Sequence, residues 1–390
     1  MSTPTLRHFH HLDDAVVERL FLHRPQPITH GDPTRVLALA LGATLYVPGN
    51  RDDLAGTIRR RFADGVTSMV IDLEDAVADD QEDHAAACAV AALDELADGP
   101  TAGMLLFVRT RTPERIPKIA AELGAGRAAL SGFVLPKFTA SIAREGLDAV
   151  VRASEVLGTH LYAMPVLESP EIVYRETRDA ELSRIAQHLN EYRDHVLAAR
   201  IGATDMCGMF GIRRDRDLTI YDVRVAADAI ASIINYLARG DGTGHIVTGP
   251  VWEYFADHER LFRPTLRQTP FAEHDAVLFR QQLVSRDIDG LLREIALDRA
   301  NGMHGKTVIH PTHVAAVHAL SAVTHEEYHD AVDIAGGNAG GVRPSTYRNK
   351  MNELKPHRHW ARGVLDRAHV FGVTNPNVTF VDLLTALVPA

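Results

Sequence analysis

Residues 68–77, SMVIDLEDAV, run from small and apolar side chains directly into three acids, Asp72, Glu74 and Asp75. A continuous apolar run of this length is typical of a buried strand. Acidic side chains are costly to bury unless a positive charge meets them. We therefore expect a strand that ends beside a cationic group contributed by another part of the chain.

Short apolar runs of the same kind recur along the chain, with longer amphipathic stretches between them. Most are continuous rather than alternating, which suits parallel strands covered on both faces. This alternation favours an α/β fold, and over this length a (β/α)8 barrel. An open doubly wound sheet is the alternative, but no GxGxxG follows the first run. The predicted strands are 45–47, 68–73, 104–109, 132–135, 161–167, 198–203, 245–247 and 307–309.

We expect three parts in the chain. Residues 1–44 form an N-terminal extension that packs on the barrel, and residues 45–320 form the barrel, with a helical insertion at 251–289. Residues 321–390 form a C-terminal helical extension that is a candidate for covering a neighbouring active site. Within it, the run KMNELKPHRHWARGVLDRA at 350–368 predicts a helix.

Composition excludes several functional classes. The 390 residues include 41 Lys or Arg and 51 Asp or Glu, a formal net charge of -10. Phosphate contacts need clustered basic side chains, so we expect no nucleic-acid binding. No apolar run approaches the ~20 residues that span a bilayer, and no targeting signal is found. Only Cys88 and Cys207 occur, without a disulfide framework, and we expect a cytoplasmic protein.

Charged side chains follow several predicted strands at the point where each strand ends. In a (β/α)8 barrel, functional side chains lie at the carboxyl ends of the strands and in the loops that follow them. Besides the acids of the opening stretch, the residues at these positions are Arg51, Arg109, Lys137, Glu168, Asp205 and His310. Any one of them alone would be an ordinary surface charge, but their coincidence at one rim favours a functional site.

Glu168 and Asp205 are the strongest candidates for metal ligands. Each follows a predicted strand, in MPVLE and ARIGATD, and adjacent parallel strands lie about 5 Å apart. Two carboxylates at that spacing repel each other unless a cation lies between them. Mg²⁺ prefers oxygen ligands and keeps positions for water or substrate, with Mn²⁺ as the alternative. Zinc is not favoured, because Cys207 lacks ligand spacing, and we interpret the histidines of MHGKTVIHPTH as structural.

Arg109 ends a predicted strand and faces the same rim. A guanidinium there can hold a substrate carboxylate through two hydrogen bonds and stabilise a developing oxyanion. It can equally pair with Glu74 or Asp75, so that the acidic loop holds the arginine in position.

Seven motifs occur in an order known from one family: LYVPGNRDDL, SMVIDLEDAV, LLFVRT, GFVLPK, PVLESPEIV, RIGATDM and GMHGKTVIHPTHV. Together they resemble the citrate lyase β-subunit-like proteins of the HpcH/HpaI aldolase superfamily, over residues 45–314. The resemblance implies a TIM barrel, Mg²⁺-dependent carbon–carbon lyase or Claisen-type chemistry, and a homo-oligomer, either a trimer or a hexamer.

The resemblance also implies roles for individual residues. Glu168 and Asp205 match the metal ligands, Arg109 matches the arginine that binds the 2-oxo acid, and Glu74 and Asp75 match the acidic loop of the site.

A C-terminal acid is implied as well. In relatives, an aspartate of an MID motif reaches the site from a neighbouring subunit as acid or base. Here KMNELKPH places Glu353 at that position, which keeps a carboxylate but adds one methylene. We further expect the substrate pocket to be lined by Asn50, Pro136, Lys137, Gly202 and Ala203.

The predicted activity is a Mg²⁺-dependent retro-aldol or retro-Claisen cleavage, or its reverse, of a 2-oxo or 2-hydroxy acid, with a CoA thioester as one option. The length of 251–289 and the basic run 350–358 depart from the relatives and leave the substrate open. The alternatives are a malate synthase-like condensation, thioester hydrolysis, and a catalytically silent binding or scaffold subunit.

Overall fold

The computed structural model describes residues 5–255, 288–337 and 340–387. Within these ranges, eight parallel strands form one sheet in the order β8-β7-β6-β5-β4-β3-β2-β9. Each overlaps a strand predicted from the sequence, so those predictions are confirmed. The strands are β2 (Ala43–Pro48), β3 (Ser68–Asp72), β4 (Leu105–Arg109), β5 (Leu130–Leu135), β6 (Tyr162–Leu167), β7 (Ala199–Ile201), β8 (Val247–Thr248) and β9 (Lys306–Val308).

The sheet closes on itself between its edge strands, β8 and β9. Gly249, directly after β8, pairs with Lys306 in a parallel bridge. The Gly249 amide donates to the Gly305 carbonyl, and the Thr307 amide donates to the Gly249 carbonyl, both at 3.0 Å. A Cβ on Gly249 would approach Asp298 Oδ2 to 2.5 Å, so a glycine is needed for this close pairing. The closed barrel rules out the open doubly wound sheet.

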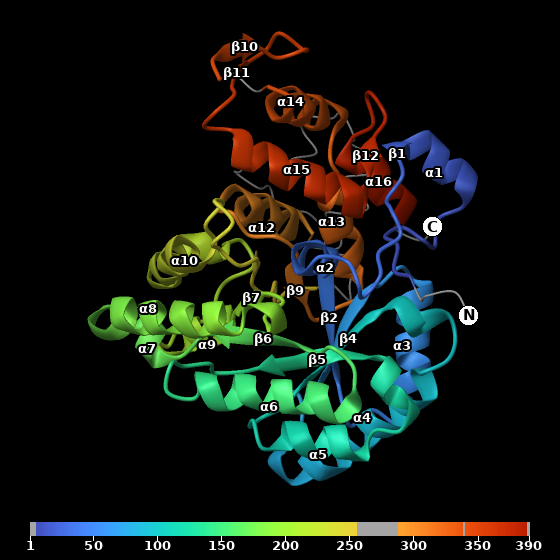
Figure 1. Cartoon of the computed structure of the whole chain (residues 1–390), viewed down its shortest axis with the longest axis vertical. Coiled ribbons are helices and arrows are strands. Elements are labelled where there is room, and N and C mark those ends of the chain that lie inside the picture. Colours follow the sequence, from blue (N-terminus) through green and yellow to red (C-terminus); the bar gives the residue numbers. More distant parts are fainter. Residues whose placement is uncertain (1–4, 256–287, 338–339, 388–390) are drawn as a thin grey trace.

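Helices follow the strands and surround the barrel (Figure 1). In α6 (Ala143–Leu157), apolar residues at helical spacing are buried, and Gly158 ends the helix in the left-handed conformation, with φ 64°. The other covering helices are α3 (Leu54–Ala63), α4 (Glu82–Leu96), α5 (Arg115–Glu122), α8 (Arg175–Glu191), α10 (Arg224–Leu237), α12 (Asp289–Ala300) and α13 (Thr312–Ser321), with short α7 (Pro170–Val173) and α9 (Ala203–Gly208). Short 3-10 helices lie at Asp79–Gln81, Pro100–Gly103, Ala125–Ala128, Arg193–His195 and Ile220–Asp222.

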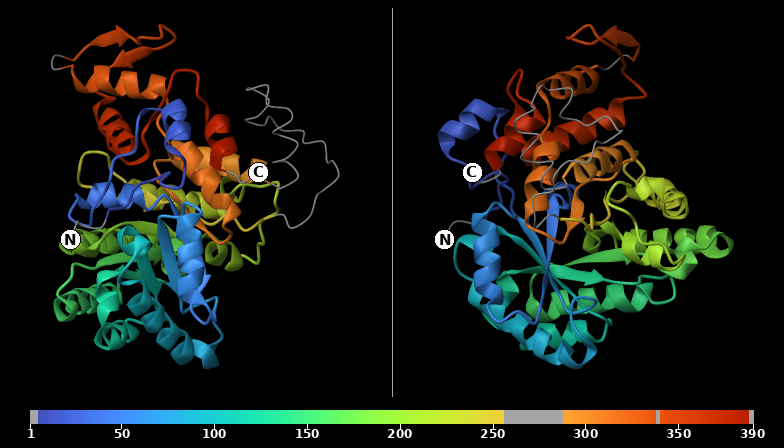
Figure 2. Two further views of the ribbon diagram at one scale, coloured as in Figure 1. Left: turned by 90° about the vertical axis from the view of Figure 1, so that its right-hand side faces the viewer. Right: turned by 180° about the vertical axis from the view of Figure 1, so that it is seen from behind.

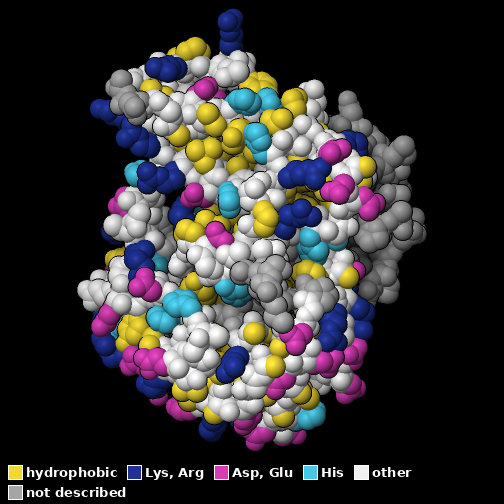
Figure 3. Space-filling model, turned by 45° about the vertical axis from the view of Figure 1, so that its right-hand side comes forward, with side chains coloured by type: hydrophobic (Ala, Val, Ile, Leu, Met, Phe, Trp, Pro, Cys, Tyr) yellow, Lys and Arg dark blue, Asp and Glu magenta, His cyan; other side chains and the backbone are white. Residues whose placement is uncertain are grey.

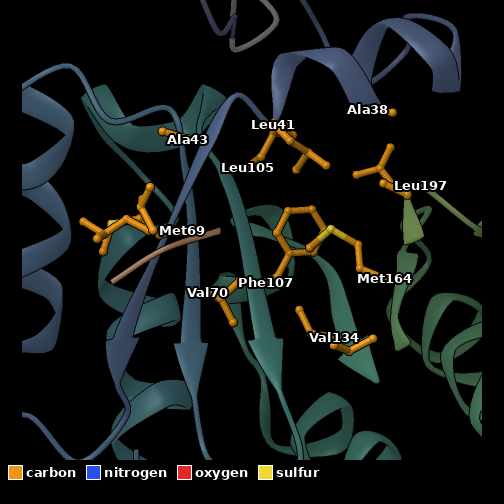
Figure 4. Packing of buried hydrophobic residues seen from close by; sticks show 14 of the residues in the cluster. Ala38, Leu41, Ala43, Met69, Val70, Leu105, Phe107, Val134, Met164 and Leu197 are labelled. Carbon is orange, nitrogen blue, oxygen red and sulfur yellow. The ribbon is translucent and has the colours of Figure 1, made fainter. Parts of the chain in front are cut away.

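A continuous apolar core fixes the strands. Val70, Phe107 and Met164, from β3, β4 and β6, are completely buried. Figure 4 shows the Met164 side chain reaching the ring of Phe107. Burying one such side chain contributes roughly 1.5–3 kcal/mol. The strand ends therefore rest on a rigid base.

The N-terminal segment packs at the end of the barrel where the strands begin. It contains α1 (Asp14–Leu20), β1 (Phe21–His23) and α2 (Thr34–Ala40), and α2 leads directly into β2. His8 Nε2 donates to the Ala40 carbonyl at 3.0 Å. β1 pairs antiparallel with β12 (Val373–Thr374), so the two ends of the chain are joined in one ribbon.

The C-terminal lobe, residues 323–387, has a small core of its own. It contains α14 (His325–Ala335), the paired strands β10 (Val342–Pro344) and β11 (Met351–Glu353), α15 (Arg358–Phe371), β12 and α16 (Phe380–Leu387). Ala331, Leu354 and Val364 belong to this second core. Because α15 packs on α2, the lobe lies at the amino ends of the barrel strands (Figure 2).

One prediction about the extensions is wrong, and another falls largely outside the described residues. Residues 350–368 do not form one helix, because 351–353 form β11 and α15 begins only at Arg358. Pro356 explains the break, since proline disfavours helical backbone in the residue before it and donates no hydrogen bond. Of the predicted helical insertion 251–289, residues 256–287 lie outside the described residues.

Charged side chains of both signs are mixed on the surface. Figure 3 shows one face, on which Lys and Arg side chains are interspersed with Asp and Glu. Among the helices of the described ranges, none has both the length and the apolar character needed to span a membrane.

Candidate active site

The acids of SMVIDLEDAV meet their cation in Arg109, the last residue of β4. Asp72 ends β3 and lies in register with Arg109 on the neighbouring strand. Its carboxylate accepts hydrogen bonds from Nε and Nη2 of Arg109, both at 2.6 Å. Nη1 lies 3.0 Å from Glu74 Oε2 and 3.5 Å from Asp75 Oδ2. The expected pairing with Glu74 and Asp75 exists, but the bidentate partner is Asp72.

The acids around Arg109 stabilise its charged form. Burial opposes the charge, but the hydrogen bonds and the charge of Asp72 outweigh it and raise the pKa of Arg109. The guanidinium is therefore a permanent cation, held on one edge by Asp72 and close to the loop acids on the other.

Lys137 links this acidic loop to the next strands. It follows β5 with φ at 48°, a conformation uncommon for a residue that has a Cβ. In this conformation its backbone amide donates to Glu168 Oε1 at 2.9 Å. Its ammonium donates to Glu74 and lies 3.6 Å from Asp75, and the hydrogen bond to Glu74 raises the pKa of Lys137. A strained backbone is thus maintained where it orients two carboxylates.

Glu168 and Asp205 come together at the same rim. Glu168 follows β6 and is only 4% exposed. Burial, together with the charge of Asp205, raises the pKa of Glu168 to about 7 against the opposing effect of the hydrogen bond from the Lys137 amide. Asp205 was predicted to lie at the end of a strand. It lies instead in the first turn of α9, because β7 already ends at Ile201. The two carboxylates nevertheless act on each other.

Gly202 joins β7 to α9 and lies against Glu168. A Cβ built on Gly202 would lie 1.8 Å from Glu168 Oε2 and 2.5 Å from Glu168 Cβ. Its φ of -95° is ordinary, so close packing and not backbone conformation requires the glycine. Predicted to line the substrate pocket, Gly202 also fixes the position of Glu168.

The remaining predicted site residues differ in location. Pro136 and Ala203 are buried at the rim, directly after β5 and at the start of α9. Asn50, in the loop after β2, donates from Nδ2 to Gln81 Oε1 at 2.6 Å. Glu353 is exposed on β11, in the lobe at the opposite end of the barrel (Figure 1). The structure therefore does not bring Glu353 to the rim of its own chain.

Two side chains inside the barrel support the site and were not predicted. Two guanidinium groups lie over the Tyr46 ring, with Arg109 5.2 Å and Arg200 5.5 Å from its centroid. Arg200 is 1% exposed and donates to Thr44 Oγ1 at 3.4 Å and to Thr307 Oγ1 at 2.5 Å. The signal in the sequence was an arginine inside an otherwise apolar strand.

The carboxylates of Glu168 and Asp205 suit a magnesium ion. They offer the oxygen ligands that Mg²⁺ prefers, and the raised pKa of Glu168 indicates a buried acid whose negative charge is incompletely balanced. Within the described residues, no three His, Cys, Asp or Glu side chains form a group that could hold a metal ion. A metal on this pair would take its other ligands from water or substrate.

A closed barrel of parallel strands with charged side chains at their carboxyl ends defines the chain as a TIM-barrel enzyme. Its family is that of the carbon–carbon bond lyases: the family model described as "C-C_Bond_Lyase of the TIM-Barrel fold" matches residues 35–373, and the chain belongs to this family. The predicted fold class, family resemblance and enzyme class are thereby confirmed.

Two solved structures illustrate the similarity in fold. CitE from Mycobacterium tuberculosis, in complex with magnesium, acetoacetate and coenzyme A, is 19% identical with a TM-score of 0.52, over 85% of this chain and 99% of that one. A citrate lyase from Burkholderia xenovorans LB400 is 16% identical with a TM-score of 0.58, over 89% and 96%. At these identities the likeness concerns the fold alone. No curated protein matches the chain.

Proposed function

We propose that this protein catalyses the Mg²⁺-dependent cleavage or formation of a carbon–carbon bond in a small 2-oxo or 2-hydroxy acid, free or as a CoA thioester. The observation that carries the proposal is the meeting of Glu168, Asp205 and Arg109 at one rim of a lyase-family barrel. The complex of the M. tuberculosis protein with magnesium, acetoacetate and coenzyme A supports these ligand classes.

In this proposal Glu168 and Asp205 hold the metal, which when bound supplies a Lewis acid for the substrate oxygens. The Lys137 amide and the close contact with Gly202 keep the Glu168 carboxylate in one orientation. Such fixed geometry lowers the barrier, because no reorganisation is needed during the reaction.

Arg109 is the group that receives negative charge from the substrate. Asp72 occupies its Nε and Nη2, so the guanidinium cannot turn away, while Nη1 lies toward the acidic loop. A substrate carboxylate or a developing enolate oxygen competes with Glu74 for that Nη1. Arg109 then stabilises the oxyanion as bond cleavage delivers electrons to it.

We further propose that Glu353 moves the proton at the site of a second copy of the chain. Glu353 lies on β11, far from its own rim, and the β10–β11 hairpin exposes Val342 and Met351 to 56% and 57%. Exposed apolar side chains beside a carboxylate suit an interface between copies. A homo-oligomer, a trimer or a hexamer, would bring this carboxylate to a neighbouring rim.

Two variants test the metal assignment. Glu168→Gln and Asp205→Asn should each abolish Mg²⁺-dependent turnover of a 2-oxo or 2-hydroxy acid, or of its CoA thioester. Each should also abolish the rise in melting temperature that Mg²⁺ and oxaloacetate produce together. Glu171→Gln, an exposed acid in α7 near Glu168, is the matched control and should behave like the wild type. Full activity in both site variants would overturn the assignment.

Analysis of the products formed by the wild-type protein distinguishes the candidate reactions. Release of a 2-oxo acid supports the lyase, whereas consumption of acetyl-CoA or propionyl-CoA with glyoxylate indicates a malate synthase-like condensation. Free CoA formed without a second substrate indicates thioester hydrolysis.

A further inference from the structure

A pocket lies at the opposite end of the barrel from Glu168 and Asp205. It has a volume of about 510 Å³ and lies between the C-terminal lobe and the barrel. α15 forms one wall, while α12, the residues that follow α10 and the residues that lead into β8 and β9 form the other. Pockets of roughly 300–1,000 Å³ are the usual size for small-molecule sites.

The walls of this pocket are cationic, although the chain carries a formal net charge of -10. Its lining side chains include the four arginines Arg35, Arg239, Arg299 and Arg367, against a single acid, Glu327, among the described residues. Arg35 is balanced by Asp366 outside the pocket, at 2.7 Å. An excess of guanidinium groups therefore remains on the wall.

Of the four arginines, Arg367 alone is buried. It is only 6% exposed and forms an ion pair with Glu327 at 2.5 Å. Its Nε has no hydrogen-bond partner among the described residues. A buried N–H without a partner is unfavourable, so an acceptor entering the pocket and bonding to this Nε would be stabilised.

His304 reports how closely the positive charges gather. Burial, and after it the charges of Arg367, Arg35 and Arg299, lower the pKa of His304 to about 3. These guanidinium groups come from α15, from α2 and from α12, so three separate elements direct positive charge at one place.

An aromatic ring lies on the same wall. Trp360, in the first turn of α15, lines the pocket and is 43% exposed. Forked guanidinium groups bind phosphate through paired hydrogen bonds. An exposed indole beside them offers a face on which a planar base can stack.

We propose that this pocket binds a phosphate-bearing small molecule of the nucleotide class, with its phosphates on the arginines and its base against Trp360. The site is separate from the catalytic rim and does not depend on the proposed reaction. Because its two walls belong to the barrel and to the C-terminal lobe, the bound ligand holds the lobe to the barrel.

Calorimetric titration of the full chain without Mg²⁺, using inorganic pyrophosphate and ADP as probes, tests the proposal. Both should bind the wild type, and the double variant Arg239→Ala, Arg299→Ala should weaken both by at least about tenfold. Trp360→Ala should weaken ADP and leave pyrophosphate unchanged. Arg362→Ala, an exposed arginine on α15 outside the pocket, should change neither.

Two further outcomes decide against the site. Failure of both probes to bind the wild type overturns it. Glu168→Gln must retain binding, because loss of affinity in that variant would place the ligand at the catalytic rim instead. Melting temperatures without ligand establish that each variant is folded, so a loss of binding is not mistaken for unfolding.

Discussion

Gly202 leaves space for the Glu168 carboxylate that any other residue would fill. An added Cβ would lie 1.8 Å from Oε2, so Gly202→Ala must displace the acid. Because a displacement of about 1 Å can cost up to 10²-fold in rate, we expect kcat/KM to fall at least about tenfold while the protein stays folded.

Gly208→Ala is the matched control, since Gly208 lies at the end of α9, the helix that Gly202 precedes, and an added Cβ there meets no atom within 4 Å. Steady-state kinetics and Mg²⁺ titration of both variants check the prediction. Equal activity in the two variants would show that the position of Glu168 does not matter.

Single residues also show what could be read from the sequence. Glu168 and Arg109 were found because parallel strands bring their carboxyl ends to one edge whatever the details of packing. Asp72 as the bidentate partner of Arg109 was missed, because it depends on the register between β3 and β4. The φ of 48° at Lys137 depends on the whole loop, and the residue type does not indicate it.

Among the elements, α13 is joined to the N-terminal segment by two buried histidines. His318 Nε2 accepts from the Ala43 amide at 3.3 Å, and its ring centroid lies 4.8 Å from that of His8. Burial lowers the pKa of His318 well below 6.5, and it lowers the pKa of His8 to about 3. The folded protein therefore stays neutral at both rings where the unfolded chain takes up protons.

This difference makes folding sensitive to acid. The contribution of these neutral histidines to the free energy of unfolding is complete above pH about 6.5. Below that pH it falls by about 1.4 kcal/mol per pH unit for each such histidine. His318→Gln keeps an acceptor but cannot be protonated, so its free energy of unfolding should fall less steeply between neutral pH and pH about 5. Denaturant unfolding at several pH values measures the slope, and the exposed His369→Gln should keep the wild-type slope.

The strands and helices of the barrel were largely predictable, and the lobe was not. Continuous apolar runs identify strands covered on both faces, and even the short β8 was found. In the run 350–368, a helical interpretation overlooked Pro356, and β11 forms only because β10 supplies its hydrogen-bond partners. A strand of three residues has no periodicity of its own to detect.

For the whole molecule, the distance of Glu353 from its own rim predicts active sites shared between copies. Glu353→Gln and Asp205→Asn should each be inactive alone. In mixed oligomers, a subunit with an intact rim receives Glu353 from its neighbour, so part of the Mg²⁺-dependent activity should return. Co-expression with two affinity tags and purification of the mixed species measures this. Mixed oligomers as inactive as either parent would contradict the shared site.

The ribbon of β1 and β12 has a consequence for the newly made chain. Roughly 350 residues separate the two strands, and a ribosome adding about 5–20 residues per second needs roughly 20–70 s to make them. Until then Phe21, 4% exposed in the finished protein, lacks its partner strand. A chain cut short before Val373 never forms this ribbon, so β1 keeps unpaired backbone groups that chaperones and proteases can recognise.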